Sequence, residues 1–190
     1  MLNNIRNSLQ PHLEKLGNSF ASTGISPTGW SIIGLVFGLT SAFIYGWNIE
    51  FSLVIGGIVL LVAGFFDIVD GQVARVTQKV SKTGGFLDSV FDKIAEVAIF
   101  FGILVGGFAE PYLVFLAISL SLLVSFTRSR AESLGVKLQG IGIGERAERL
   151  FVIAIVGIIG FMEYAVIIVI IIAGITFIQR IIVTLKALRD

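Results

Sequence analysis

The 190-residue chain contains no cysteine and only one histidine, and just 14% of its residues are charged. Without cysteine it can form no disulfide, no thiolate metal site and no cysteine nucleophile. The single histidine, His12, lies in the N-terminal segment and is expected to be an interfacial side chain rather than a catalyst. Soluble domains carry about 25% charged residues. With 55% hydrophobic residues and a mean hydropathy of +0.95, the chain is expected to be an integral membrane protein with one domain.

The first 24 residues are expected to form an amphipathic helix. Leucine and isoleucine recur there at three- and four-residue spacing, and there is no continuous apolar segment of the kind found in cleavable signals. Such a helix either lies at the membrane interface or packs on the rest of the protein, and the sequence leaves both open. The spaced apolar residues are Leu2, Ile5, Leu9, Leu13 and Leu16.

Residues 25–190 are expected to form an all-α bundle of six transmembrane helices. A span needs about 20 apolar residues. Three very short turns separate the spans in pairs, which predicts three hairpins. The spans are expected at about 28–48, 51–76, 84–107, 111–135, 145–162 and 164–187.

The charges are distributed asymmetrically about these spans. All 14 lysines and arginines fall near the two termini or near the two longer loops, whereas the short turns hold only Glu50, Glu110 and Glu163. The positive-inside rule therefore places both termini, and both longer loops, on the cytoplasmic side of the cell membrane.

Four aspartates stand out in this apolar chain. Asp67 and Asp70 are three residues apart near the end of the second span, and Asp88 and Asp92 are four apart near the start of the third. Each spacing places its pair on one helix face, and the short loop between the spans allows the pairs to meet. Four unbalanced carboxylates would be very unfavourable there. Oxygen ligands suit Mg²⁺ or Mn²⁺, so the four acids are predicted to hold two such ions.

A structural alternative is that the acids pair with the nearby cations Arg75, Lys79, Lys82 and Lys93. The glycines fit this alternative badly. Gly71 follows Asp70 directly, and two glycines open the third span, so a ligand can approach the backbone closely. Metal ions beside small residues and an arginine suit a diphosphate.

The segment from Asp67 to Asp92 reads D-x-x-D-G-x-x-A-R-x8-G-x3-D-x3-D without a departure. This pattern resembles the CDP-alcohol phosphotransferase family, whose members have six membrane helices and a cytoplasmic N-terminal helix. The resemblance implies that an alcohol hydroxyl attacks the β-phosphorus of a CDP-linked lipid and that CMP leaves. It also implies a homodimer, formed through the third and fourth spans.

The resemblance also implies roles for particular residues. Asp67, Asp70, Asp88 and Asp92 would ligate the metals, and Asp92 would in addition act as general base on the acceptor hydroxyl. A short segment before the first span contributes to the nucleotide site, with Thr28 where many relatives have Asn or Asp. The residues implied for the CDP-lipid are Pro27, Thr28, Ser31, Asp67, Asp70, Gly71, Ala74, Arg75 and Gly84.

The second cytoplasmic loop is rich in arginine, and the sixth span adds Arg180. Guanidinium groups bind phosphate oxygens well, so their convergence favours an acceptor that itself carries phosphate. The alternative is that the arginines anchor the helices at the headgroups or pair with Glu132, Glu145 and Glu148. For Arg130 and Arg146 the two interpretations stay open.

"RSRAESLG" followed by "GERAERL" resembles the phosphatidylinositol-phosphate synthases of this family and their archaeal counterparts, which use CDP-archaeol. That resemblance implies inositol 1-phosphate as acceptor, with Arg128, Arg149 and Arg180 around its phosphate. Glycerol 3-phosphate is the alternative acceptor, and serine or free inositol would not need this pocket. The donor is either CDP-archaeol or CDP-diacylglycerol; the short chain, rich in isoleucine and glycine, favours CDP-archaeol slightly.

Other classes of function fit less well. An ion transporter usually has polar residues along both halves of its pathway, whereas the ionisable residues here gather on one side. A scaffold has no use for four clustered aspartates, and no nucleic-acid partner is expected. The glycine-rich stretches indicate close helix packing, either within the bundle or between the subunits of a dimer.

Overall fold

The computed structural model describes residues 2–138 and 140–189, with side chains described from Gln10 onward. Within these ranges the chain is entirely helical, as expected, and the long helices match the predicted spans closely. In chain order the helices are α1 Leu2–Ala21, α2 Pro27–Trp47, α3 Ser52–Val76, α4 Lys82–Val105, α5 Pro111–Ser133, α6 Arg146–Ile158 and α7 Met162–Ala187.

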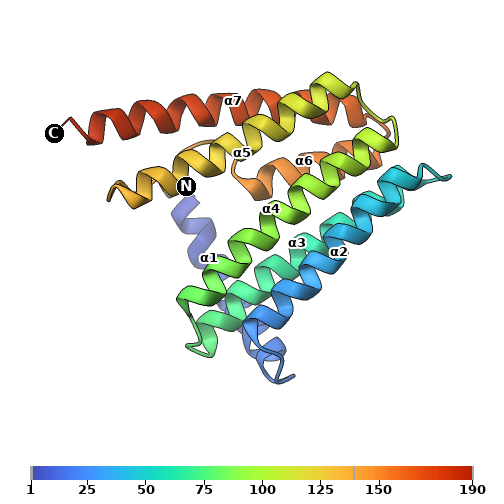
Figure 1. Ribbon diagram of the computed structural model, residues 1–190. Helices are drawn as coiled ribbons and strands as arrows, with labels where there is room; N and C mark the ends of the chain where they lie inside the picture. Colours follow the sequence, from blue (N-terminus) through green and yellow to red (C-terminus); the bar gives the residue numbers. More distant parts are fainter. Residues whose placement is uncertain (1, 139, 190) are drawn as a thin grey trace.

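The helices form two groups (Figure 1). Helices α2, α3 and α4 run side by side, α5 and α7 form a second pair, and α6 lies between α3 and α7. The core between the groups is apolar and includes Tyr45, Phe100, Ile153 and Val169. Both ends of the α3–α4 connection, which carry the aspartates, therefore lie against the N-terminal end of α2 and the start of α6.

Small residues set how closely the first group packs. A Cβ added at Gly102 on α4 would collide with the carbonyl of Ala42 on α2, and one added at Gly38 would lie 3.1 Å from the Cβ of Ala95. A Cβ at Gly57 on α3 would meet Ile158 of α6 at 2.5 Å. At these three positions the glycines serve packing within the bundle, which was one of the two predicted uses.

Four of the described helices, α2, α3, α5 and α7, are long and apolar enough to cross a membrane. Helix α4 has sufficient length, but its first half carries the acids of the motif. Helix α6 was expected to run over about 145–162, yet it has only 13 residues. At 1.5 Å per residue it is about 20 Å long, less than the hydrocarbon core of about 30 Å. Gly160, with a φ of 93°, forms the turn that follows it.

Helix α1 packs on the protein through its second half. Leu16, Phe20 and Ala21 contact a small core of Trp30, Val69 and Val73, and the ring of Phe20 lies edge-on to that of Trp30. The prediction that the N-terminal helix packs on the rest of the protein therefore holds for this half. This packing of α1 also fixes the N-terminal end of α2 beside the aspartates of α3.

Candidate active site

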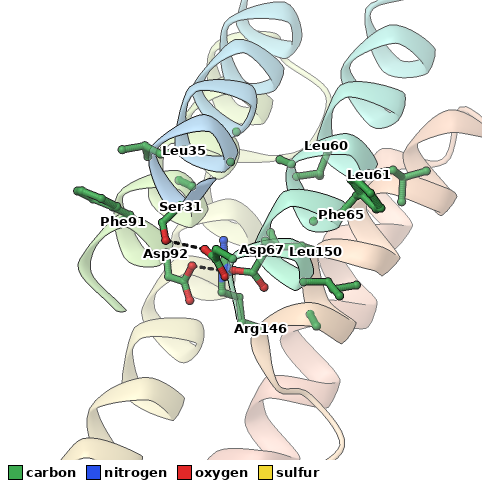
Figure 2. Close-up of a pocket in the computed structure, with 18 of the residues that line it drawn as sticks. Ser31, Leu35, Leu60, Leu61, Phe65, Asp67, Phe91, Asp92, Arg146 and Leu150 are labelled. Carbon is green, nitrogen blue, oxygen red and sulfur yellow. Dashed lines mark hydrogen bonds and ion pairs between the residues drawn. The ribbon is translucent and has the colours of Figure 1, made fainter. Parts of the chain in front are cut away.

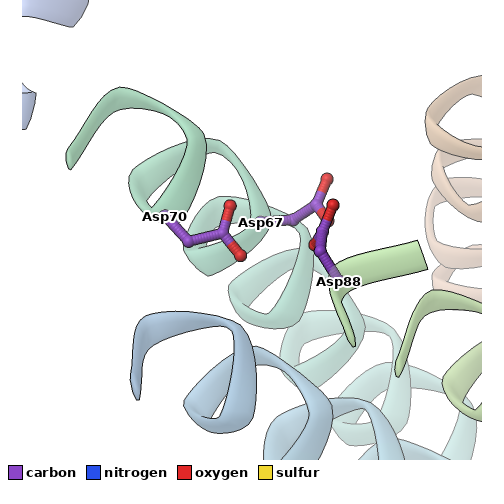
Figure 3. Close-up of side chains that lie close together, drawn as sticks. All are labelled: Asp67, Asp70 and Asp88. Atoms are coloured by element: carbon purple, nitrogen blue, oxygen red, sulfur yellow. The ribbon is translucent and has the colours of Figure 1, made fainter. Parts of the chain in front are cut away.

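Three of the predicted carboxylates lie together. Asp67 and Asp70 come from α3 and Asp88 from α4, and one oxygen of each lies within 4.8 Å of the others (Figure 3). Helical spacing explains the arrangement, because residues three apart project from the same face of α3. Three converging oxygen donors fit a hard divalent cation such as Mg²⁺ or Mn²⁺.

Asp92, the fourth acid of the motif, forms an ion pair. Its carboxylate lies 2.5 Å from Nη1 of Arg146, and the same nitrogen donates to Asp67 at 2.8 Å (Figure 2). Arg146 is the first residue of α6, so the contact between α3 and α6 brings a guanidinium between two of the acids. Two of the acids, Asp67 and Asp92, are thus ion-paired, but with a cation from a distant part of the sequence.

The four cations considered for that ion-pair interpretation do not reach the acids. Among the described side chains, only Lys93 of the four forms an ion pair, and its partner is Glu96 at 2.6 Å. Arg146 therefore pairs with two of the four aspartates, Asp67 and Asp92, and within the described part of the chain none of the four nearby cations forms an ion pair with any of them.

A cavity of about 150 Å³ opens beside Asp70 and Asp88, and we refer to it as the nucleotide cavity because most of the residues predicted for the nucleotide site line it. Ser31, at its edge, donates a hydrogen bond to Asp70 at 2.6 Å and so fixes that carboxylate. A Cβ added at Gly71 would meet no atom within 4 Å, which shows that this helix face is open. Of the predicted CDP-lipid residues, those that line this cavity are Pro27, Thr28, Ser31, Asp70, Gly71, Ala74 and Gly84.

Two predicted CDP-lipid residues lie outside that cavity. Asp67 lines the neighbouring apolar groove. Arg75 instead lines a separate cavity between α1 and α3, with Glu14 and Gln72 among its neighbours. The cation that does line the nucleotide cavity is Lys79, which sequence reasoning had considered only as a partner of the acids.

An apolar groove of about 330 Å³ runs from the carboxylates along α2, α3 and α6 (Figure 2). Its walls are large hydrophobic side chains, among them Leu35, Leu60, Phe65, Phe91 and Leu150. The groove therefore joins a charged end to a hydrocarbon-like interior, which suits a ligand with a charged headgroup and an apolar chain.

A third cavity, of about 400 Å³, contains the arginines that were predicted to bind an anion. Arg128, Arg149 and Arg180 all line it, together with Asp92 and Arg146. The structure thus brings the three arginines together beside the aspartates, although they come from three different helices.

Two of these arginines are deeply buried and hold partners of their own. Nε and Nη2 of Arg149 donate to Glu96 at 2.9 and 2.5 Å. Arg180 donates to the carbonyls of Ile141 and Val124 and lies 3.3 Å from Glu145. Arg128 is more exposed, with ion-pair distances of 2.9 Å to Glu132 and 3.9 Å to Glu145.

Sequence reasoning missed Glu96 as a site residue. It follows Asp92 by four residues, just as Asp92 follows Asp88, so the repeated spacing was a visible signal that the acidic face of α4 continues for another turn. Glu145 was considered only as a surface partner of the arginines. No local pattern indicated that Arg146 would reach the aspartates.

Asp88 is the point at which the three cavities meet. It lines the nucleotide cavity, the apolar groove and the arginine cavity. Asp92 lines the groove and the arginine cavity. Ligands held in these three cavities would therefore approach one another at these two carboxylates.

This helical membrane fold, with three cavities meeting at a carboxylate cluster, defines a membrane enzyme that joins two ligands at one charged centre. Residues 27–184 match the CDP-alcohol phosphatidyltransferase family. The archaetidylinositol phosphate synthase of Pyrococcus horikoshii is 41% identical over 184 residues, 95% of each chain. That of Methanothermobacter thermautotrophicus is 39% identical over 144 residues, 73% of each.

Solved structures have the same fold. The Mycobacterium tuberculosis phosphatidylinositol phosphate synthase with CDP-DAG bound gives a TM-score of 0.79 at 21% identity, over 90% of this chain and 92% of that one. The same enzyme in complex with manganese and citrate gives 0.78 at 22% identity, over 90% and 88%. The chain belongs to the CDP-alcohol phosphatidyltransferase family. It is a multi-pass membrane protein and a CDP-alcohol phosphotransferase.

Proposed function

We propose that the enzyme transfers the archaetidyl or phosphatidyl group of CDP-archaeol or CDP-diacylglycerol to inositol 1-phosphate and releases CMP. The observation that carries the proposal is the position of Asp88 at the junction of the three cavities. Relatives that are 41% and 39% identical carry the name archaetidylinositol phosphate synthase, which supports both the acceptor and the archaeol-linked donor.

The donor occupies two of the cavities. Its cytidine lies between the start of α2 and the glycines of α3 and α4, where Gly71 leaves space for it. Its lipid chains follow the apolar groove lined by Leu60 and Phe65. The diphosphate then lies at the carboxylates, where the charged and apolar parts of the site meet.

Asp67, Asp70 and Asp88 would hold the metal, and Asp92 would complete the set for a second ion. Bound Mg²⁺ or Mn²⁺ would offset the charge of the diphosphate and of the phosphate oxygens during transfer. Without that charge compensation, dianionic substrates and ionised carboxylates would repel one another in this partly buried site.

Asp92 is the general base. It lines both the groove and the arginine cavity, which supports a position between the donor phosphorus and the acceptor hydroxyl when both substrates are bound. As the hydroxyl oxygen forms its bond to the β-phosphorus, its proton passes to the Asp92 carboxylate. The bond between the β-phosphorus and the bridging oxygen breaks, and the oxygen leaves with CMP.

The acceptor phosphate binds among Arg128, Arg149 and Arg180. Arg128 is the accessible member, whereas the buried Arg149 and Arg180 are rigidly held by their protein partners. A cavity of about 400 Å³ with this charge admits a phosphorylated polyol. Glycerol 3-phosphate has the same phosphate and remains the second candidate acceptor.

In the membrane, α4 and α6 complete six spans, and α1 lies at the cytoplasmic interface. Helix α6 is too short to cross the hydrocarbon core unaided, so its span depends on its packing against α3 and α7 and on local thinning of the bilayer. All lysines and arginines then face the cytoplasm, together with both termini and the active site. We further propose a homodimer formed through α4 and α5, whose outward faces carry exposed side chains such as Phe101 and Phe115.

The experiment is a CMP-release assay with purified enzyme, Mg²⁺ or Mn²⁺, and each CDP-lipid against inositol 1-phosphate, glycerol 3-phosphate, free inositol and serine. Release with inositol 1-phosphate alone is expected. Release only with glycerol 3-phosphate would support the proposed transfer reaction but show that glycerol 3-phosphate, and not inositol 1-phosphate, is the acceptor. No release with any pair, together with ion flux in proteoliposomes, would favour transport.

A further inference from the structure

Two neighbouring residues at the start of α6 have opposite charges, and each lies in a site whose other side chains have the charge opposite to its own. Glu145 immediately precedes the helix and Arg146 begins it. Arg146 lies among the aspartates, and Glu145 lies among the arginines. Each therefore occupies a site whose charge suits a different ligand.

The contacts of Arg146 are those expected of a cation that another cation could displace. A single nitrogen, Nη1, serves both Asp67 and Asp92. Its buried Nε has no hydrogen-bond partner among the described residues. A buried donor without a partner costs about 1–3 kcal/mol, so the guanidinium fits this position imperfectly. It lies at the border of the apolar groove and the arginine cavity.

Glu145 has the corresponding place on the anionic side. Its Oε1 lies 3.3 Å from Nη2 of Arg180 and 3.9 Å from Nη1 of Arg128. It makes no cap hydrogen bond to α6, although it holds the cap position. The remaining bonds of Arg180 go to backbone carbonyls, so Glu145 is its only ionic partner among the described side chains.

The backbone around the two residues is firmly held. The N–H groups of Ile143 and Gly144 donate to Thr176, and Nη1 of Arg149 donates to the Gly144 carbonyl. Displacement of Glu145 and Arg146 therefore involves their side chains and leaves the loop in place.

We propose that Glu145 and Arg146 are internal placeholders, which offset part of the charge of the acceptor-phosphate site and of the metal site and must be displaced when the ligands bind. This inference rests on the proposed function. Arg146 would compete with the metal for Asp67 and Asp92. Glu145 would compete with the acceptor phosphate for Arg128 and Arg180, so that an acceptor without phosphate could not displace it. Glu145 is in this way a specificity-determining residue.

Metal binding tests the Arg146 half without any need for turnover. Mn²⁺ binding to the purified enzyme is measured by electron paramagnetic resonance, without substrate. In Arg146→Gln the dissociation constant should fall on the order of 10-fold, since no internal cation competes. Arg146→Lys keeps the charge but loses the reach and the planar group, and it should also bind Mn²⁺ more tightly than the wild type.

Arg130→Gln is the matched control. It also removes one positive charge from the second cytoplasmic loop region, but among the described residues the side chain of Arg130 hydrogen-bonds only to Ser133. A change below about 2-fold is expected, because distant exposed charges are screened. If Arg146→Gln and Arg146→Lys bind Mn²⁺ no more tightly than the wild type or this control, the placeholder role of Arg146 is wrong.

Acceptor binding tests the Glu145 half. Inositol 1-phosphate binding is measured by calorimetry in metal-free buffer. Glu145→Gln should bind it at least about 5-fold more tightly, while the exposed Glu148→Gln, which removes the same charge one turn away, should change little. Equal effects in the two variants, or none in Glu145→Gln, would overturn the role of Glu145.

The proposed function is checked separately by CMP release from the wild type. Wild-type CMP release with unaltered Mn²⁺ binding in the Arg146 variants refutes only the placeholders. A wild type that neither binds Mn²⁺ nor releases CMP refutes both the function and the inference that rests on it.

Discussion

The buried pair of Glu96 and Arg149 allows a structural role of an arginine to be separated from a role in binding. Their side chains are each 1% exposed, and two guanidinium nitrogens donate to one carboxylate oxygen. Glu96→Gln would leave the guanidinium buried without its counter-charge. Loss of one partner of a buried ion pair costs about 3–5 kcal/mol. Since domains are stable by only about 5–15 kcal/mol, this loss should be large.

Replacement of both partners should behave differently. Apolar residues of similar volume in place of a buried ion pair are often neutral or stabilising. We therefore expect Glu96→Leu with Arg149→Met to recover most of the stability that Glu96→Gln loses, and to remain about 1–3 kcal/mol below the wild type because the Gly144 carbonyl loses its hydrogen bond from Nη1 of Arg149. Lys93 would lose its partner too, but its side chain is 29% exposed and remains partly solvated.

The double variant should nevertheless be a poor enzyme. If Arg149 binds the acceptor phosphate, the KM for inositol 1-phosphate should rise at least about 10-fold, the loss of one charged hydrogen bond, while the KM for the CDP-lipid stays unchanged. Stability is measured by SDS titration in mixed micelles, and KM by CMP release. A stable double variant with wild-type KM would assign Arg149 a structural role only. A double variant as unstable as Glu96→Gln would refute the reasoning about the isolated pair.

Three further predictions concern the carboxylates and the nucleotide cavity. Asp92→Asn should lower kcat about 10²–10⁴-fold, the contribution of a general base, and leave CDP-lipid binding by calorimetry intact; wild-type turnover would remove Asp92 from that role. Excess EDTA should abolish CMP release by the wild type, and so should the substitution Asp70→Ala. Readdition of Mn²⁺ should restore activity only to the EDTA-treated wild type. Full turnover in EDTA would exclude a role of a metal ion in catalysis. Gly71→Leu should raise the CDP-lipid KM about 10-fold or more, because the new side chain would fill the open space beside Gly71. The free energy of unfolding should stay equal or rise by up to about 1 kcal/mol, since leucine favours helix more than glycine does. An unchanged KM would place the nucleotide elsewhere.

The helices were predictable because long apolar runs and short polar turns alternate cleanly along the chain. Pro27 and Pro111 begin α2 and α5, positions where proline is well tolerated. The short turn that holds Glu163 was predicted, but α6 ends at Ile158, four residues before the expected boundary of 162, because isoleucine and glycine continue up to the break at Gly160 without any change in hydropathy. A turn inside an apolar run depends on backbone conformation, which composition does not report.

The motif located the carboxylates but not all of their neighbours. Its fixed spacing correctly indicated that Asp67, Asp70 and Asp88 converge, since both helix periodicity and the short loop act locally. Arg75 shares that motif, yet it follows Ala74 by one residue and thus points about 100° away, toward α1. Membership of a motif therefore did not guarantee a place in the same cavity.

The residues that sequence reasoning missed are those that balance the charges it found. Arg146 balances Asp67 and Asp92, Glu96 balances Arg149, and Glu145 faces Arg180. These pairs join residues 35–79 positions apart, so no local spacing reveals them. Yet a buried charge without a partner is strongly unfavourable, so each functional charge requires an opposite one nearby. In this chain, Glu145 just before α6 and Arg146 at its first position supply two of them, and we propose that these same two residues stand where the phosphate and the metal would otherwise bind.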